Sequence, residues 1–166
     1  MTDREAEVVR ATEADIAGIL ELQAANQAEN GGGLSASLPG SRIVEMMSDM
    51  PLIVARRNDR IIGFLMTSIR AMNADVPIIR AMLDAYPGSD TAYLYGPTCV
   101  DIKERGKGLA QAMFEELRRL LPGREGILFI RRDNTASFAA HDKMGMREVA
   151  SFEFNGADYA VFSYFG

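Results

Sequence analysis

The chain has 166 residues, of which 48% are hydrophobic and 25% are charged. Eighteen Lys and Arg residues against 23 Asp and Glu residues give a formal net charge of -5. This balance is typical of a folded globular chain and argues against intrinsic disorder. An acidic chain also lacks the overall field that attracts nucleic acid or an anionic membrane surface, so we expect neither as a partner.

Cysteine and histidine are scarce, since Cys99 and His141 are the only examples of each. No disulfide can form within the chain, and a zinc site would have to depend on carboxylates, so we expect no metal cofactor. The charged residues 1–5 are not followed by the apolar stretch of a secretory leader, and no apolar run is long enough to span a bilayer. We therefore expect a soluble, cytoplasmic protein, and the length favours a single domain over residues 1–166.

The first part of the chain predicts two helices and three strands. In chain order these are a strand over 7–11, helices over 16–27 and 41–49, and strands over 52–57 and 60–69. Thr12 and Asp15 have the spacing of a capping box before the first helix, and Ser41 is expected to cap the second. The turn pair Asn58-Asp59 makes the last two strands a hairpin. Three glycines at 31–33 predict a loop, because they cost too much backbone entropy inside an element.

The remaining segments alternate between helix and strand. In chain order they are a helix over about 75–86, a strand over 91–101, a helix over 110–121, a strand over 126–131, a helix over 134–144, and strands over 146–154 and 158–165. Pro77 is tolerated in the first turn of a helix. Gly96-Pro97 interrupts the long strand, where we expect a bulge or the end of its pairing. Asn155-Gly156 is a two-residue hairpin turn. This order predicts a mixed α/β fold.

Residues 100–110, VDIKERGKGLA, carry the most chemistry, because a strand there runs into a glycine-containing loop that opens a helix. Backbone N–H groups at a helix start lack helical partners and the helix dipole favours an anion, which predicts a phosphate or pyrophosphate site. Gly106 and Gly108 allow a close approach, and Arg105 and Lys107 add positive charge. The pattern is neither a Walker A loop nor a Rossmann fingerprint. The alternative is that the glycines only shape a tight turn.

These residues resemble the Q/R-x-x-G-x-G/A motif of the GCN5-related N-acetyltransferases (GNAT), in the form VxIxxRGxGLA at 100–110. RATxxD at 10–15 is similar to the opening before the family's first helix, and NTAS at 134–137 stands where its fourth helix begins. KMGM at 143–146 resembles that helix's KLGF exit. The resemblance implies a mixed, mostly antiparallel central sheet of six to seven strands, with a splayed middle pair and about four flanking helices.

The resemblance also implies acetyl-CoA as the co-substrate. In this family the amides of the 105–110 loop hold its pyrophosphate, and strand backbone groups pair with its pantetheine arm. The cofactor-binding residues implied in this way are Val100, Ile102, Arg105, Gly106, Lys107, Gly108, Leu109, Ala110 and Asn134. For Asn134, a plain helix N-cap is an equally compatible reading.

For catalysis, the family often uses a tyrosine as the acid seven residues after the helix-starting Asn, and this chain has His141 there. Its imidazole could protonate the leaving thiolate or shuttle a proton, and the alternative is that it packs or binds cofactor without titrating. Cys99 is expected to be a buried, inert thiol rather than an acyl-enzyme nucleophile. The base is left open, since the family usually uses a Glu, an Asp or a water chain. Four residues on the appropriate strand are candidates, with a structural or substrate-lining role as the favoured alternative for each: Tyr93, Tyr95, Thr98 and Asp101.

The resulting expectation is an N-acetyltransferase. It would transfer an acetyl group from acetyl-CoA to the amine of a small molecule or amino acid, by direct attack in a ternary complex. The alternatives are a non-catalytic acyl-CoA-binding or sensing module and an acetyltransferase for a protein N-terminus or lysine. A homodimer through the C-terminal strands, around residues 152–162, would also suit this family.

Overall fold

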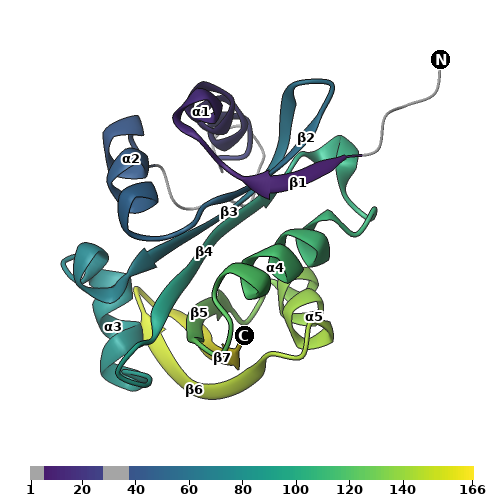
Figure 1. The fold of residues 1–166 in the computed structure, drawn as a ribbon. Coiled ribbons are helices and arrows are strands. Elements are labelled where there is room, and N and C mark those ends of the chain that lie inside the picture. The colour runs from purple at the N-terminus through teal and green to yellow at the C-terminus, as the bar shows by residue number, and fades with distance from the viewer. Residues whose placement is uncertain (1–5, 28–37) are drawn as a thin grey trace. The chain divides into compact units, whose positions relative to one another are not determined.

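The computed structural model describes residues 6–27 and 38–166, so the glycine loop expected at 31–33 lies outside the described residues. The helices are α1 (Ile16–Ala25), α2 (Gly40–Asp49), α3 (Pro77–Ala85), α4 (Leu109–Leu120) and α5 (Thr135–Lys143). The strands are β1 (Glu7–Arg10), β2 (Ile53–Arg57), β3 (Arg60–Ile69), β4 (Tyr93–Val100), β5 (Glu125–Arg131), β6 (Arg147–Phe154) and β7 (Ala157–Phe165) (Figure 1). Two compact units result, a first unit of Met1–Thr67 with Gly96–Leu120 and a second unit of Ser68–Tyr95 with Leu121–Gly166.

The described strands are hydrogen-bonded in the order β1-β2-β3-β4-β5-β7-β6. Pairing is parallel between β4 and β5 and antiparallel for β1–β2, β2–β3, β5–β7 and β6–β7. The predicted mixed, mostly antiparallel sheet is confirmed, with seven strands and, in the described part of the chain, five α-helices rather than about four. The β4–β5 ladder consists of Tyr93–Gly126 and Leu94–Ile127, as short as a splayed pair requires.

The start of α1 is set by the predicted capping pair. The Thr12 backbone N–H donates to Asp15 Oδ2 at 2.9 Å, and a 3-10 turn leads from there into the helix. The helix ends at Ala25, two residues earlier than predicted. The reason is local, because the Asn26 side chain folds back and donates to the Leu22 carbonyl at 2.9 Å, which a longer helix would need for its own ladder.

The predicted N-cap of α2 is wrong by two residues. The helix begins at Gly40 with Pro39 as its N-cap, so Ser41 lies inside the first turn. The Pro39 carbonyl accepts from the N–H groups of Arg42 at 3.0 Å and Ile43 at 3.1 Å, which closes the turn on proline. Sequence reasoning favoured serine because its hydroxyl is a good capping group, but backbone geometry placed the cap earlier.

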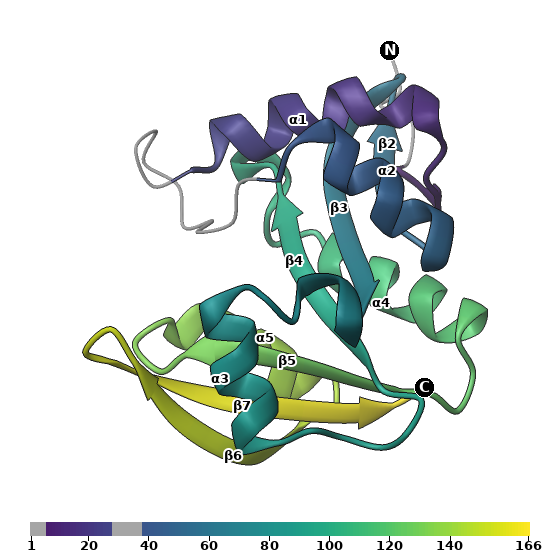
Figure 2. The ribbon, with the colours of Figure 1, turned by 90° about the vertical axis from the view of Figure 1, so that its left-hand side faces the viewer.

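Helices lie on both faces of the strands in the first unit. Figures 1 and 2 show α1 and α2 on one face of β1–β3 and α4 on the other, where it contacts β1 and β2. The amphipathic face of α4 buries Met113, Phe114 and Leu117. Helix α1 approaches β3 closely at Gly18, where an added Cβ would come within 2.5 Å of Ile61 Cγ1.

The second unit packs α3 and α5 on opposite faces of β5, β7 and β6 (Figure 2). Pro77 occupies the first turn of α3, as predicted, since its missing N–H is not needed there. Helix α3 contributes Ile79, Met82 and Leu83 to an apolar cluster with strand residues. The strand members and their neighbours are Ala92, Leu94, Ile127, Phe129, Val149, Ala150, Phe152 and Val161.

Both predicted hairpin turns are confirmed by their backbone angles. Asn58 and Asp59 have φ of 53° and 63°, and Asn155 and Gly156 have φ of 49° and 78°. Two consecutive residues with positive φ match the right-handed twist of the flanking strands, which is why Asn, Asp and Gly stand there.

A buried carboxylate ties three segments of the second unit together. Glu125 is 1% exposed and accepts hydrogen bonds from Tyr86 Oη at 2.7 Å, the Ser89 N–H at 2.6 Å and the Ser163 hydroxyl. Burial acts to raise the pKa of Glu125, but the three donors outweigh it and the pKa lies below its usual value. Glu125 is therefore ionised at neutral pH and links the end of α3 to β5 and β7.

We predict that Glu125→Ala lowers the free energy of unfolding by about 3 kcal/mol or more, because it leaves three donors unpaired. Glu148→Ala is the matched control, since it removes a solvent-exposed ion pair to Arg132 and should cost less than about 1 kcal/mol. Urea denaturation of both variants measures the difference. Equal losses would contradict a structural role for Glu125.

Candidate functional site

The turn between β4 and α4, residues 101–108, is anchored in the first unit by Asp101. The Asp101 N–H donates to the Ile62 carbonyl of β3 at 2.8 Å, and its side chain accepts from the Lys103 N–H at 3.0 Å. A 3-10 turn at Ile102–Glu104 follows directly. These bonds turn the chain sharply at the end of β4, so that α4 starts close to the strand's C-terminal end.

Gly106 and Gly108 give this turn its shape. Their φ angles are 79° and 80°, in the left-handed region that other residues adopt only with strain. A Cβ added at either position would meet no atom within 4 Å, so the space beside both glycines is open. The backbone here is therefore both dependent on glycine and accessible to a ligand.

The N-terminus of α4 adds unpaired donors beside the open glycines. The first intrahelical bond runs from the Ala112 N–H to the Gly108 carbonyl at 3.0 Å. The N–H groups of Leu109, Ala110 and Gln111 precede that bond and so lack a partner within the helix. Together with the helix dipole they form the donor set that binds phosphate groups in proteins.

The charged side chains of this turn are already engaged with the protein. Arg105 donates from Nη2 to Asn26 Oδ1 at 3.0 Å and from Nε to the Val100 carbonyl at 3.1 Å. Lys107 Nζ lies 3.1 Å from Glu104 Oε2, and this hydrogen bond lowers the pKa of Glu104. An incoming anion would therefore compete with the Glu104 carboxylate for Lys107.

Val100 and Ile102 differ in backbone conformation. Val100 is the last residue of β4, whereas Ile102 lies in the 3-10 turn with a side chain that is 70% exposed. Only Val100 has the strand conformation that pairing with an extended ligand uses. Of the helix-start residues, Leu109 is buried and Ala110 is half-buried.

His141 lies in the second unit, on the last turn of α5, and is 9% exposed. Its Nδ1 lies 2.8 Å from the Ser137 carbonyl and 3.3 Å from the Ser137 hydroxyl, and its Nε2 lies 3.2 Å from Tyr95 Oη. Burial lowers the pKa of His141 below 6.5, and the Ser137 carbonyl opposes this only in part. The imidazole is therefore neutral at neutral pH, so it must gain a proton before it can donate one to a leaving group.

Asn134 is the N-cap of α5, and its Oδ1 accepts from the Ser137 N–H at 3.2 Å. This is the capping alternative that the sequence left open for Asn134. The cap fixes the first turn of α5, and the same turn carries the Ser137 carbonyl that His141 contacts.

Among the four residues that the sequence left open as a base, three have hydrogen-bond partners, and one of these three is Tyr95, which contacts His141 Nε2. Tyr93 hydrogen-bonds to the Tyr164 hydroxyl, and burial raises the pKa of Tyr93 to about 12. Asp101 pairs with Arg60 at 2.6 Å. Thr98 Oγ1 is buried and has no hydrogen-bond partner among the described residues.

Cys99 is buried in the first unit, as predicted. Burial raises the pKa of the Cys99 thiol to about 11. The thiol is therefore protonated at neutral pH and lacks the thiolate that a covalent acyl-enzyme would require.

Sequence reasoning did not identify Tyr95 and Ser137 as hydrogen-bond partners of His141. Ser137 and His141 are separated by four positions on a helix, a spacing that predicts a contact. Tyr95 is 46 positions away from His141 and could not be assigned from spacing. The structure brings these three residues together in the second unit.

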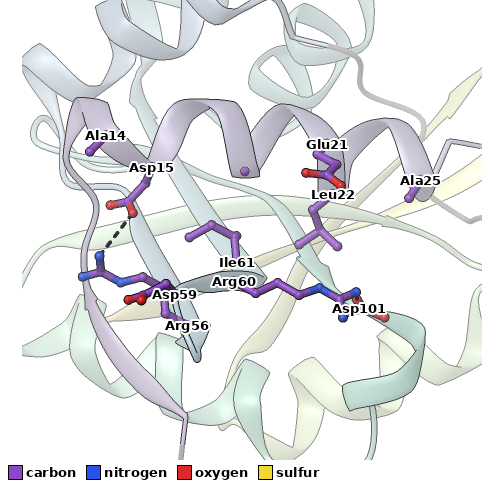
Figure 3. A pocket seen from close by; sticks show the side chains of 11 residues that line it. Ala14, Asp15, Glu21, Leu22, Ala25, Arg56, Asp59, Arg60, Ile61 and Asp101 are labelled. Atoms are coloured by element: carbon purple, nitrogen blue, oxygen red, sulfur yellow. Dashed lines mark hydrogen bonds and ion pairs between the residues drawn. The ribbon is translucent and has the colours of Figure 1, made fainter.

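A cavity of about 470 Å³ lies in the first unit beside α1 and the β2–β3 turn, and Asp101 of the 101–108 turn is part of its lining (Figure 3). Its charged lining consists of Asp15, Glu21, Arg56, Asp59, Arg60 and Asp101. Arg56 pairs with Asp15 at 3.3 Å across it. Its lining includes none of the expected cofactor-binding residues.

None of the helices in residues 6–27 and 38–166 is long and apolar enough to cross a bilayer. Within the same residues, no group of three or more His, Cys, Asp or Glu side chains is placed to hold a metal ion.

The lowered pKa of His141 predicts a pH-dependent stability. The unfolded chain binds a proton at His141 near pH 6.5, while the folded chain resists it, so the free energy of unfolding should fall as pH drops below 6.5. Chemical denaturation between about pH 7.5 and about pH 5.5 should show a shallower fall in His141→Phe than in the wild type. The carboxylates with lowered pKa titrate below 4.5, outside this window. If the free energy of unfolding falls with pH equally steeply in both proteins, the lowered pKa of His141 is contradicted.

Comparison with known proteins identifies the fold and the family. No curated protein matches the chain significantly. YncA, a putative acetyltransferase from Salmonella typhimurium solved with acetyl-CoA, shows 17% identity, coverage of 98% of this chain and 94% of its own, and a TM-score of 0.66. A GNAT superfamily phosphinothricin acetyltransferase from Sinorhizobium meliloti, also solved with acetyl-CoA, shows 18% identity, coverage of 98% and 89%, and a TM-score of 0.69.

The ribosomal-protein-S18-alanine N-acetyltransferase from Escherichia coli shows 12% identity, coverage of 97% and 94%, and a TM-score of 0.68. At these identities the solved structures establish the fold alone. The sequence profile of the acetyltransferase (GNAT) family matches residues 20–146, well over half of the chain. The chain therefore belongs to the GNAT family and is an acetyl-CoA-dependent acyltransferase.

Proposed function

We propose that the protein transfers an acetyl group from acetyl-CoA to the amine of a small molecule or amino acid, by direct attack in a ternary complex. The observation that carries the proposal is the turn before α4. Two open, left-handed glycines there precede a helix start with unpaired N–H groups. The family membership of the chain supports the pyrophosphate of coenzyme A as the anion that such a turn would hold.

The proposed cofactor site is formed by the turn and the end of β4. The pyrophosphate would accept hydrogen bonds from backbone N–H groups, and the strand backbone at Val100 would pair with the pantetheine arm. The residues proposed for this site are Val100, Ile102, Arg105, Gly106, Lys107, Gly108, Leu109, Ala110 and Asn134. Val100 is better supported than Ile102, since only Val100 has strand conformation.

For the chemistry, we propose His141 as the group that carries the proton. The acceptor amine attacks the thioester carbonyl carbon, the new C–N bond forms, and the amine gives up one proton. The neutral imidazole takes up one proton at Nε2 in this step. The C–S bond then breaks with its electron pair on sulfur, and the imidazolium returns the proton to the thiolate. Shuttling is favoured over simple acid catalysis because His141 starts without the extra proton.

The small-molecule acceptor is supported by the histidine at position 141, where the family resemblance leads one to expect tyrosine. Some acetyltransferases of small amines have histidine at this place. Two of the three named structures are of enzymes with different kinds of acceptor, phosphinothricin in one and a ribosomal-protein alanine in the other. A panel of amines, amino acids and peptides assayed by thiol release separates these classes.

We further propose that residues 1–166 act as one acyl-CoA N-acyltransferase domain, because the family profile covers parts of both units. A cytoplasmic location is proposed from the sequence. A homodimer is proposed through the C-terminal strands, since β6 stands at one end of the strand order and is therefore available to pair with a second copy.

We predict that Gly108→Glu abolishes measurable coenzyme A binding in isothermal titration calorimetry. The substitution places a carboxylate where the pyrophosphate should lie and strains a residue at φ 80°. Gly123→Glu is the matched control, because Gly123 has φ 74° and open space beside it, so it adds the same charge and a similar strain elsewhere. Equal affinities in the two variants would contradict the cofactor site.

We also predict that His141→Phe lowers kcat at least about tenfold, a modest share of the roughly 10²–10⁴ that a proton-transfer group supplies. The dissociation constant of coenzyme A should change little, because the pyrophosphate turn is untouched. Asp142→Asn, an exposed neighbour on α5, serves as the control and should keep the wild-type rate. An unchanged kcat in His141→Phe would show that His141 packs in the protein without transferring a proton in the reaction.

A further inference from the structure

Tyr95 and His141 form a buried polar pair in the second unit, and this pair restricts how His141 can exchange a proton. Tyr95 is 6% exposed and His141 is 9% exposed. Tyr95 Oη lies 3.2 Å from Nε2, and the two rings meet edge to face with centroids 5.5 Å apart. Tyr95 follows directly after Leu94, the last β4 residue in the ladder with β5.

The hydrogen bonds of the pair define one tautomer. The Ser137 carbonyl oxygen can only accept, so at 2.8 Å it receives a proton from Nδ1. A neutral imidazole protonated at Nδ1 has a lone pair at Nε2. The Tyr95 hydroxyl must therefore donate to Nε2, and both ring nitrogens are occupied in the resting protein.

Among the described residues, the titratable side chain that contacts His141 Nε2 is Tyr95. The ring of Tyr95 is in edge contact with Tyr164 of β7, at a centroid distance of 5.8 Å. Burial and the Ser137 carbonyl are the two causes of the shifted His141 pKa. By contrast, the neighbouring Tyr93 hydroxyl bonds to another tyrosine hydroxyl and contacts no imidazole in the described structure.

We propose that the Tyr95 hydroxyl relays the proton between the reacting amine and His141, an inference that rests on the proposed function. As the amine gives its proton to Tyr95 Oη, the hydroxyl proton of Tyr95 passes to Nε2, so tyrosine stays neutral and histidine becomes cationic. After the C–S bond breaks, the same path runs in reverse and delivers the proton to the thiolate. In this relay Tyr95 exchanges protons with the substrates, and Ser137 is a positioning residue that acts through the imidazole ring.

The first test is spectroscopic and does not depend on activity. Because His141 is the only histidine, long-range ¹⁵N–¹H correlation spectra of labelled full-length protein report its ring without assignment. We expect a neutral ring protonated at Nδ1 in the wild type. In Tyr95→Phe the Nε2 resonance should move further from its protonated value, whereas Tyr93→Phe, which removes another buried tyrosine hydroxyl, should leave it in place. A wild-type ring protonated at Nε2, or an Nε2 signal unmoved by Tyr95→Phe, would overturn the relay.

The second test is a double-mutant cycle of thiol release from acetyl-CoA, using the fastest acceptor from a panel of small amines and amino acids. Tyr95→Phe and His141→Phe should each lower kcat at least about tenfold, and the double variant should be no slower than the slower single one. Multiplicative effects, or a normal kcat in Tyr95→Phe, would overturn the relay while leaving the transferase intact. No thiol release with any amine would overturn the proposed function and the relay with it, even if the NMR result holds.

Discussion

The site depends on backbone N–H groups that have no partner within helix α4, at the point where β4 turns into this helix. Helix α4 cannot satisfy the donors of its own first turn, and the two left-handed glycines before it keep side chains away from them. A Cβ at these positions would meet no other protein atom. Glycine is therefore required for the left-handed backbone angle and for the access that it gives to a ligand. The buried apolar face of α4 holds this helix start in position.

The chemistry of the second unit is set by a competition between burial and hydrogen bonding. At His141 burial has the larger effect, so the pKa falls and the ring is neutral at neutral pH. At Glu125 three donors outweigh burial, and the carboxylate stays charged although it is almost fully enclosed. The two groups lie in the same unit and reach opposite outcomes. All three partners of Glu125 donate to its charged carboxylate, whereas only the Ser137 carbonyl favours the protonated ring of His141.

The elements with strong periodic patterns were predictable from the sequence, and so was the turn before α4, because glycine, capping and hairpin signals act over a few residues. The end of α1 and the cap of α2 were missed, since Asn26 and Pro39 each reset the local hydrogen bonding. Neither the Tyr95–His141 hydrogen bond nor the three hydrogen bonds to Glu125 could be predicted. Both join residues far apart in the chain, and a single sequence does not say which polar side chains meet after folding.

The pairing of Lys107 with Glu104 also has a consequence for how the turn would respond to ionic strength. Salt weakens the attraction of a lysine for a diphosphate, but it weakens the internal ion pair that holds the lysine back as well. The two effects partly cancel, so affinity at this turn should vary less steeply with salt than at a turn with an unopposed cation. Recognition would then rely mainly on neutral backbone dipoles, whose directions are fixed by the fold.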